Sequence, residues 1–426
     1  MPRFDNSEIA ALGEVLRGDS LWPYAFGTIW ADPLRGALEQ IGTDFAQEGE
    51  SPRCVVPTSS GTASIHVALG GLGIPAGAEV IVPPITDMGS IMPVIFQNAI
   101  PVFADLDPRR GLLTPQTVAD AITERTRAVI AVHLSGTPVD IEGIIEVCRA
   151  AQARHGHPIR VIEDCAQALG ATLNGRPLGS FGDAGCFSLN TWKHLTCGEG
   201  GFVVLRDADH RAPCMLFADK HRDRLGQPES SYQGSGLNYR ASLIDGAMLS
   251  AQLQELDRIA QARNAIGQLA DARLAQIEGV TPQPHLAGAF ATYFMVMFRL
   301  EAVEAERKRD ILSHVRGALG EGARLRLGGT YSDLIYRSGV FMRKAFFNAD
   351  TAPGDAMPLW PAELAAQELE RRGQYGASVA YDYRTVCCPG AEDYAANSFC
   401  LQLQWNTGES DIEAVTDAFA EAIRAA

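Results

Sequence analysis

Residues 185–201 read GCFSLNTWKHLTCGEGG. This segment places one lysine, Lys193, between an apolar run that ends at Ser188 and a cluster of glycines, and a second apolar run, Phe202–Leu205, follows. The pattern predicts a strand, a loop that carries the lysine, a glycine turn and another strand. An amine held in this way at the mouth of a sheet can form a Schiff base with an aldehyde cofactor. Most lysines are solvated surface residues, so the segment alone favours an ordinary lysine and needs support from the rest of the chain.

Composition limits the classes of protein to consider. The chain has 426 residues, of which 46% are hydrophobic and 20% are charged, and its formal net charge is −15. These values predict a globular protein of two domains and argue against binding to nucleic acid or to an anionic membrane surface. We expect no signal peptide and no membrane span. The nine cysteines show no metal-ligand spacing, which favours free thiols in a reducing cytoplasm and no metal site.

Short β-rich runs alternate with helical patterns over the first half of the chain, which predicts βαβ units and a mostly parallel sheet. Ligands bind beyond the carboxyl ends of such strands, where Asp164 stands. His133 is expected to support a strand end and not to take part in acid–base chemistry. The predicted strands lie at 80–83, 101–105, 128–134 and 159–163, and the predicted helices at 7–18 (with Ile9, Leu12 and Leu16 on one face), 114–123 and 140–154.

The second half has a different pattern. We expect a long connection over 207–237, then one long helix or a broken pair over 243–277. The C-terminal third reads as a smaller α+β domain, so the predicted division is 1–250 for a large domain with an N-terminal arm and 251–426 for a small one. Its predicted elements are a strand at 290–300, a helix at 302–319, an irregular stretch at 328–358, a strand at 399–403 and a terminal helix with a capping box formed by Ser410 and Glu413.

Small polar residues at 59–62 precede a helical pattern that contains Ile65 and Leu69. Free backbone N–H groups and the helix dipole make such a start a candidate phosphate site, although an ordinary helix cap is the commoner meaning of a Ser/Thr run. Five features together fit pyridoxal 5′-phosphate, which needs a lysine, a carboxylate near its ring nitrogen and a phosphate cup. They are Lys193, Asp164, the helix start at Gly61–Ala63, the Ser188 hydroxyl and Gln167.

The chain resembles the DegT/StrS-type sugar aminotransferases, which are fold type I pyridoxal phosphate enzymes. The resemblance covers roughly residues 7–280 well and the remainder loosely. The two most specific segments are VIEDCAQALGA at 161–171 and the stretch around Lys193 that ends in GEGG. The other matching segments are SSGTASIHVAL (59–69), GAEVIVPPIT (77–86), PVFADLDP (101–108), AVHLSGTPVDI (131–141) and GLNYR (236–240).

The resemblance implies an α/β fold with a large domain and a smaller α+β C-terminal domain. It also implies a role for each matching residue and a homodimer with shared sites. The implied roles are Lys193 as the Schiff-base lysine that also moves the proton, Asp164 facing the pyridine nitrogen, Gln167 facing the ring hydroxyl, Gly61, Thr62, Ala63 and Ser188 holding the phosphate, and Asn238 reaching the phosphate of the neighbouring subunit.

The sequence departs from the family at one position of the cofactor site. Members usually carry an aromatic ring after the P-x-x-T element, and here that position is Asp87, followed by Met88. Asp cannot stack on the cofactor, so either Met88 covers the ring or Asp87 contacts substrate or the imine region. Candidate substrate residues are Trp22, Trp192, Arg240, Tyr331 and Arg337. Packing of an N-terminal arm is the competing interpretation for Trp22, and a solvated or structural role is the competing one for Arg337.

The implied activity is transfer of an amino group from glutamate or glutamine to a keto-sugar, possibly nucleotide-linked, or a keto-cyclitol, in antibiotic, aminosugar or glycan biosynthesis. Two alternatives stay open at this point. One is another pyridoxal phosphate reaction, such as dehydration or oxidation of a sugar-like substrate. The other is a cofactor-binding regulatory protein, against which the intact set of Lys193, Asp164 and Gln167 argues.

Overall fold

The computed structural model describes residues 4–18, 21, 31–223, 234–320, 325–328, 333–344, 361–371 and 381–425. Trp22 and Tyr331 lie outside the described residues. None of the helices in the described ranges combines the length and apolar character that a membrane span requires.

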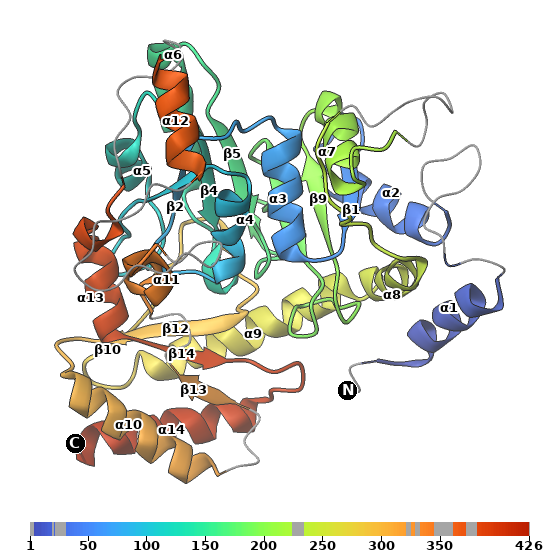
Figure 1. Ribbon diagram of the computed structural model, residues 1–426. Helices are drawn as coiled ribbons and strands as arrows, with labels where there is room; N and C mark the ends of the chain where they lie inside the picture. The colour runs from blue at the N-terminus through green and yellow to red at the C-terminus, as the bar shows by residue number, and fades with distance from the viewer. Residues whose placement is uncertain are drawn as a thin grey trace.

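A seven-stranded sheet forms the centre of the large part of the molecule (Figure 1). Its strands lie in the order β1-β9-β8-β5-β4-β2-β3, and all neighbours are parallel except β9, which is antiparallel to both β1 and β8. The predicted, mostly parallel sheet is therefore confirmed. The strands are β1 Cys54–Thr58, β2 Glu79–Val82, β3 Ile100–Phe103, β4 Thr126–Val132, β5 Arg160–Asp164, β8 Ala184–Ser188 and β9 Gly201–Leu205.

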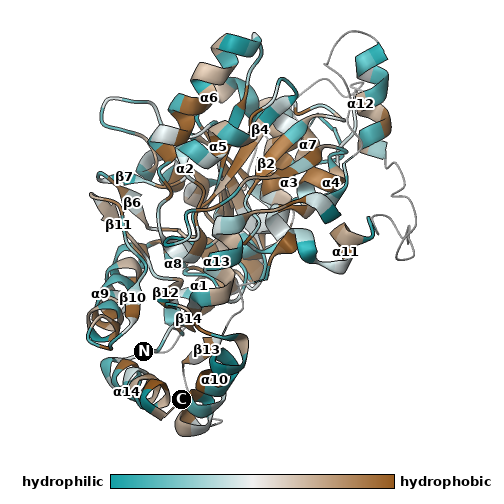
Figure 2. Ribbon diagram, turned by 90° about the vertical axis from the view of Figure 1, so that its left-hand side faces the viewer, coloured by the Kyte–Doolittle hydropathy of each residue, from teal (hydrophilic) through white to brown (hydrophobic). Residues whose placement is uncertain are grey.

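Helices cover this sheet, and around β2 and β4 the buried strands stand out as hydrophobic in Figure 2. A strand that is covered on both faces appears in the sequence as a continuous apolar run, so the positions of these strands can be predicted from the sequence. The helices of this part are α1 Asn6–Arg17, α2 Leu34–Asp44, α3 Gly61–Gly71, α4 Met92–Phe96, α5 Pro115–Ala121, α6 Ile141–His155, α7 Arg211–Ala218 and α8 Leu243–Leu253.

The expected long connection over 207–237 was wrong in part, because it contains helix α7. This helix packs closely on α3, where a Cβ at Gly70 would lie 2.3 Å from the Phe217 ring and one at Gly71 would lie 2.1 Å from the Cys214 sulfur. Two adjacent glycines thus allow the two helices to approach. The Pro213 in its first turn, where proline is tolerated, concealed the helix in the sequence.

The N-terminal helix α1 forms as predicted but uses a different face. It buries Val15 and Glu8, and the Glu8 carboxylate accepts a hydrogen bond of 3.2 Å from the Gln252 side chain on α8. Of the three residues predicted to share a face, Leu12 packs against the first core, whereas Ile9 and Leu16 are 67% and 64% exposed. The apolar pattern was read correctly, but a polar contact and Val15 determine how α1 lies on the large part.

A four-stranded antiparallel sheet, β10-β12-β14-β13, forms a second core with α9, α10 and α14. The predicted broken pair of helices is confirmed, since α8 ends at Leu253 and α9 begins at Leu256. Helix α9 then runs below the large part toward this sheet (Figure 1). The elements are α9 Leu256–Leu274, β10 Val280–Pro282, β12 Met295–Leu300, α10 Ala305–Leu319, β13 Arg326–Gly328, β14 Ser398–Gln402 and α14 Glu409–Ala425.

The terminal helix begins at Glu409, two residues earlier than a cap at Ser410 would place it, and Ser410 lies inside its first turn. The cap is different too: the Asp411 carboxylate accepts a 2.8 Å hydrogen bond from the N–H of Gly408. The expected capping box of Ser410 and Glu413 was therefore wrong, because an aspartate two residues into the helix binds the backbone ahead of it.

Segments between β13 and β14 return to the first core, to which they contribute Ile335, Tyr336, Phe341 and Tyr383 among others. The division at residue 250 stays a prediction, and the chain beyond that residue contributes to both cores. The remaining elements are α11 Gly339–Met342, α12 Pro361–Arg371 and α13 Pro389–Asn397, with a small three-stranded sheet of β6 Thr172–Leu173, β7 Arg176–Pro177 and β11 Ala289–Phe290.

A buried carboxylate fixes the backbone beside β5. Glu163 accepts hydrogen bonds of 2.7–2.8 Å from the N–H groups of Gly179, Phe181 and Gly182, and its side chain is fully buried. His133 lies 3.1 Å from the same carboxylate and accepts from the N–H of Val139, so its expected supporting role is confirmed.

Replacing Glu163 by alanine is expected to lower the free energy of unfolding by about 3 kcal/mol, because three buried N–H groups would lose their acceptor. Glu146→Ala on the exposed side of α6 is the matched control, with an expected change within about 0.5 kcal/mol. Denaturant unfolding of both variants checks this. Equal midpoints for the two would show that the 179–182 turn does not depend on Glu163.

Candidate active site

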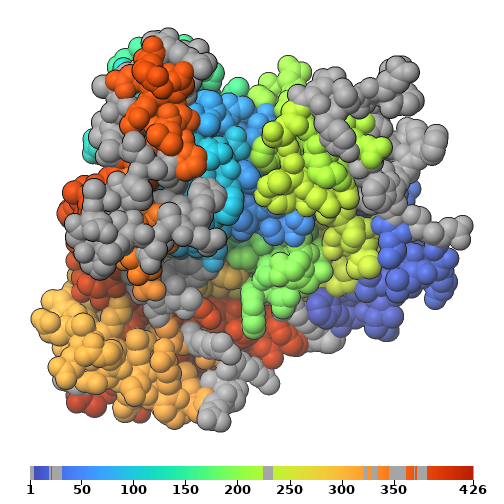
Figure 3. Space-filling view, viewed as in Figure 1, coloured from blue at the N-terminus to red at the C-terminus, as the bar shows by residue number. Residues whose placement is uncertain are grey.

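The loop that carries Lys193 joins β8 to β9 and is closed by its own backbone. The N–H of Lys193 donates to the carbonyl of Asn190 at 2.9 Å, and Asn190 forms a bridge with Gly198. Gly198 and Gly200 have φ values of 87° and 135°, which favour glycine. The predicted strand, loop, glycine turn and strand are thus confirmed. Figure 3 shows this region in light green, at the surface between the large part and the orange and red C-terminal part.

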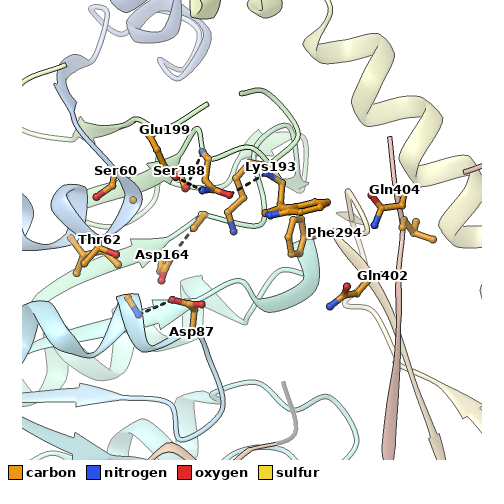
Figure 4. A pocket seen from close by; sticks show the side chains of 17 residues that line it. Ser60, Thr62, Asp87, Asp164, Ser188, Lys193, Glu199, Phe294, Gln402 and Gln404 are labelled. Atoms are coloured by element: carbon orange, nitrogen blue, oxygen red, sulfur yellow. Dashed lines mark hydrogen bonds between the residues drawn. The ribbon is translucent and has the colours of Figure 1, made fainter. Parts of the chain in front are cut away.

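Asp164 ends strand β5 and points into a cavity that Lys193 also lines (Figure 4). Its Oδ2 accepts a hydrogen bond of 2.6 Å from the Ser90 hydroxyl, which lies 2.8 Å from that of Thr86. Its Oδ1 accepts from the N–H of Ala166 at 3.0 Å. Burial raises the pKa of Asp164, while the Ser90 hydroxyl, the Ala166 N–H and the Lys193 amine oppose that rise. The hydroxyl chain therefore favours the ionised form of a buried carboxyl.

The Lys193 amine faces Asp164 from the opposite wall of the cavity (Figure 4). Burial lowers the pKa of this amine, and the carboxylates of Asp164 and Asp87 partly offset the effect. The Nζ atom also lies 4.6 Å from the centre of the Phe294 ring. A lysine with a lowered pKa has a larger neutral fraction near neutral pH, which is what a nucleophilic amine or a proton acceptor requires.

Helix α3 presents its N-terminus to the cavity. Ser60 caps the helix by accepting a 3.0 Å hydrogen bond from the N–H of Ala63. Within the described residues no hydrogen bond uses the N–H groups of Gly61 and Thr62, which are left for an anion. A Cβ at Gly61 would lie 2.8 Å from the Cβ of Ser188, so glycine lets the helix start meet the Ser188 hydroxyl.

The cavity between these groups has a volume of about 520 Å³. A buried amine at one wall, a carboxylate at another and an anion site at a helix start fit an aldehyde cofactor that carries a basic ring nitrogen and a phosphate. The residues that line the cavity are Ser60, Gly61, Thr62, Ile65, Asp87, Gly89, Asp164, Ala166, Ser188, Asn190, Trp192, Lys193, Glu199, Phe294, Gln402, Leu403 and Gln404.

The model of the DegT/DnrJ/EryC1/StrS aminotransferase family matches residues 38–346. The chain belongs to this family. It is 32% identical over 346 residues to a putative L-glutamine:3-amino-2,3-dideoxy-scyllo-inosose aminotransferase of Streptoalloteichus tenebrarius, covering 80% of this chain and 78% of that protein. It is 40% identical over 271 residues to an L-glutamine:scyllo-inosose aminotransferase of Streptomyces griseus, covering 61% of this chain and 62% of that one.

Solved structures share the fold. A 3-amino-5-hydroxybenzoic acid synthase aligns with a TM-score of 0.79 at 24% identity, covering all of this chain and 98% of the other. A sugar aminotransferase of Micromonospora echinospora aligns with a TM-score of 0.78 at 21% identity, covering 98% and 97%. The predicted fold type I architecture and the aminotransferase activity are confirmed, and the cofactor of this family member is pyridoxal 5′-phosphate.

The aminotransferase brings most of its predicted site residues together. Gly61, Thr62, Asp87, Asp164, Ser188, Lys193 and Trp192 all line the cavity, and Trp192 is 61% exposed. Ala63 does not line it, and its N–H is used by Ser60. Their individual roles toward the cofactor stay predictions.

Other predicted residues lie around the cavity without lining it. Gln167 is buried and accepts a 2.8 Å hydrogen bond from the N–H of Ser135. Met88 and Arg337 line an adjoining hollow, and Arg337 forms a 2.5 Å ion pair with Glu392. The other two candidates lie near the buried Asp219: Asn238 is exposed and forms a backbone bridge with it, and Arg240 forms an ion pair with it.

Sequence reasoning missed several groups of the aminotransferase site. Ser90 could have been found, because it lies four residues after a segment that matches the family, and Ser60 belongs to the polar run at 59–62 that the sequence did single out. Phe294 and the Gln402–Gln404 segment come from the second sheet, some hundred residues or more after Lys193. No local pattern marks them, since only the packing of the second sheet against the first brings them to the cavity.

Replacing Gly61 by alanine is expected to weaken the binding of pyridoxal phosphate by about tenfold, because the added Cβ overpacks against Ser188. Gly36→Ala is the matched control, since a Cβ there meets nothing within 4 Å. Cofactor retained after dialysis, measured by absorbance, checks the prediction. Equal retention by the two variants would contradict a phosphate site at the start of α3.

Proposed function

We propose that this aminotransferase transfers the amino group of glutamine to the keto group of a cyclitol, in the biosynthesis of an amino-sugar antibiotic. The observation that carries the proposal is the half-buried Lys193, whose amine faces Asp164 across a cavity at the N-terminus of α3. The names of the relatives from Streptoalloteichus tenebrarius and Streptomyces griseus supply the donor and the class of acceptor. They favour amino transfer over dehydration or oxidation.

Each residue has a defined task in this proposal. When bound, pyridoxal phosphate supplies the carbonyl that takes up the amino group and the ring that withdraws electrons. Lys193 would hold the cofactor and would carry a proton on its Nζ between the α-carbon of the amino donor and the carbonyl-derived carbon of the cofactor. Asp164 holds a proton on the ring nitrogen, and the Ser90 hydroxyl orients Asp164. Gly61, Thr62 and Ser188 bind the phosphate, and Gln167 orients the ring through its hydroxyl.

The charges of the cavity favour a neutral acceptor. Its charged lining residues are the acidic Asp87, Asp164 and Glu199 and the basic Lys193. Asp164 and Lys193 are used by the cofactor, so the remaining charged side chains of the cavity wall, Asp87 and Glu199, are both negative. A carboxylate accepts hydrogen bonds from the hydroxyl groups of a cyclitol and repels the diphosphate of a nucleotide-linked sugar.

The functional unit in this proposal is a homodimer with shared sites, located in the cytoplasm. Asn238, which the family resemblance assigns to the partner's phosphate, is exposed on the protomer and available to a second copy. Ile9 and Leu16 on α1 are exposed as well and would gain burial at an interface. All nine cysteines are free, which suits a reducing compartment.

The test of this function is a steady-state assay of the purified enzyme with glutamine as donor and scyllo-inosose or a nucleotide-linked keto-hexose as acceptor. We expect kcat/KM for the cyclitol to exceed that for the nucleotide sugar by roughly 10²-fold or more, the scale that polar recognition can reach. Glutamate replaces glutamine in a parallel assay. The reverse preference would overturn the acceptor, and product without donor nitrogen would overturn amino transfer.

A further inference from the structure

Asp87 occupies a fixed place between two hollows. It lines the cofactor cavity and also an adjoining hollow whose lining includes Asp333 and Arg337. Asp87 caps the short 3₁₀ turn Met88–Ser90, because its Oδ1 accepts a 2.7 Å hydrogen bond from the N–H of Gly89. A Cβ at Gly89 would lie 2.6 Å from the Thr62 hydroxyl, so this turn is pressed against the start of α3.

The second oxygen of Asp87 is available. Within the described residues, the only hydrogen bond of this carboxylate is the one from Gly89 to its Oδ1. Figure 4 shows the carboxylate on the side of the cavity toward which the Lys193 amine points, near Asp164. The turn thus fixes the direction of this exposed carboxylate, for which no ion pair is found among the described residues.

Two carboxylates near Lys193 are candidates for the anionic partner of its amine. Glu199 is exposed and accepts a 2.7 Å hydrogen bond from the side chain of Asn190. The basic side chains on the other wall have partners elsewhere: Arg263 donates to the backbone carbonyls of residues 292–294, and Arg258 pairs with Glu255. Burial lowers the pKa of His194, which keeps that ring neutral. Asp164 and Asp87 are the two carboxylates whose charge reaches the Lys193 nitrogen.

These two carboxylates have different surroundings. Asp164 is buried, and both of its oxygens accept hydrogen bonds, from Ser90 and from Ala166. A bound pyridoxal phosphate presents two nitrogen positions that can be cationic: its ring nitrogen and the nitrogen of Lys193 joined to it. Asp164 compensates the charge of the ring nitrogen, and the ring oxygen of the cofactor lies beside the second position, so a further carboxylate near Lys193 would add to the negative charge that favours a proton there.

We propose that Asp87 is the counter-ion of the Lys193 nitrogen and keeps a proton on it in the cofactor-loaded enzyme, while Asp164 serves the ring nitrogen. The inference rests on the proposed cofactor-dependent function but is independent of the acceptor. It also gives a reason for aspartate at the position where the family usually has an aromatic ring: the side chain supplies a charge in place of a stacking surface.

The test is a pH titration of the visible absorbance of the holoenzyme without donor, because this band reports whether the lysine-derived nitrogen carries a proton. In Asp87→Asn we expect the midpoint to fall by about one pH unit, since loss of a nearby negative charge disfavours the protonated form. Asparagine can still accept from the Gly89 N–H, so the turn should persist. Asp87→Glu should restore the wild-type midpoint within a few tenths of a unit.

Asp333→Asn is the matched control, because Asp333 is exposed and lines only the adjoining hollow. Its midpoint is expected to equal that of the wild type. Asp87→Ser repeats the charge removal with another cap-forming side chain, in case the asparagine variant fails to hold the cofactor. An unchanged or raised midpoint in the variants that lack the Asp87 charge would overturn the proposal, as would an equal fall in Asp333→Asn.

The same samples separate this inference from the function itself. Adding glutamine to the wild-type holoenzyme should bleach the visible band whatever the midpoint of its titration. Bleaching together with equal midpoints would leave amino transfer intact and remove the role of Asp87. A shifted midpoint without bleaching would retain the role of Asp87 and remove glutamine as the donor.

Discussion

Replacing Lys193 by alanine is expected to lower turnover by roughly 10³-fold or more, which is the upper range for loss of a positioned acid–base group. In the proposed function, the variant loses the nitrogen that would both hold the cofactor and move the proton. The methyl group of alanine should leave the loop intact, because the loop is closed by backbone contacts at Asn190, Gly198 and Lys193 itself. Initial rates with glutamine and a keto-cyclitol, together with circular dichroism, check both parts.

Lys193→Arg is the matched control for charge. Arginine keeps a cation near the Phe294 ring and between the carboxylates, but it stays protonated and cannot act as a nucleophile or a proton acceptor. We expect it to be as inactive as the alanine variant. Turnover by Lys193→Arg close to that of the wild type would mean that Lys193 contributes only its charge.

Asp164→Asn is expected to lower kcat by roughly 10²–10⁴-fold, the range for loss of a group that controls a proton in the reaction. The asparagine amide oxygen can still accept one of the hydrogen bonds from Ser90 and Ala166, so the end of β5 should keep its structure. What the variant lacks is the negative charge that, in the proposed function, holds a proton on the ring nitrogen. Rates and cofactor content, measured on the same preparation, separate slow chemistry from lost cofactor.

Ser90→Ala gives the milder control for Asp164. The Ser90 hydroxyl opposes the rise that burial causes in the pKa of Asp164, so its removal raises that pKa further. If Asp164 serves the ring nitrogen as proposed, activity requires the ionised carboxylate and is lost as pH falls through this pKa. The acid limb of the pH–rate profile should therefore move to higher pH in Ser90→Ala. An acid limb at its original pH, together with full activity of Asp164→Asn, would remove Asp164 from the mechanism.

The large part of the fold could be predicted because its signals are local. Each strand of the central sheet is buried on both faces and reads as an apolar run, and the helices between them begin at recognisable caps such as Thr114 and Asp140. Helix α1 shows where this reasoning ends. Its apolar residues Ile9 and Leu16 are exposed, because which face packs on α8 depends on contacts made by Glu8 and Val15.

The candidate site divides in the same way. Residues that end a strand or start a helix, such as Asp164 and Ser188, reach the cavity by virtue of their place in an α/β sheet. Phe294 and Gln404 reach it only through the packing of the second sheet, and nothing near them in sequence indicates that. Asp87 is an intermediate case: its identity departs from the family, but only the turn to Gly89 and the two adjoining hollows give the departure a physical meaning.

The most direct measurement is the visible spectrum of the purified protein before and after addition of glutamine, beside that of Lys193→Ala. The account predicts a cofactor band that bleaches with glutamine, returns when a keto-cyclitol is added, and is absent from the lysine variant after dialysis. A band that ignores every amino donor would contradict amino transfer. Failure of the wild-type protein to develop any band with added pyridoxal phosphate would contradict the site itself.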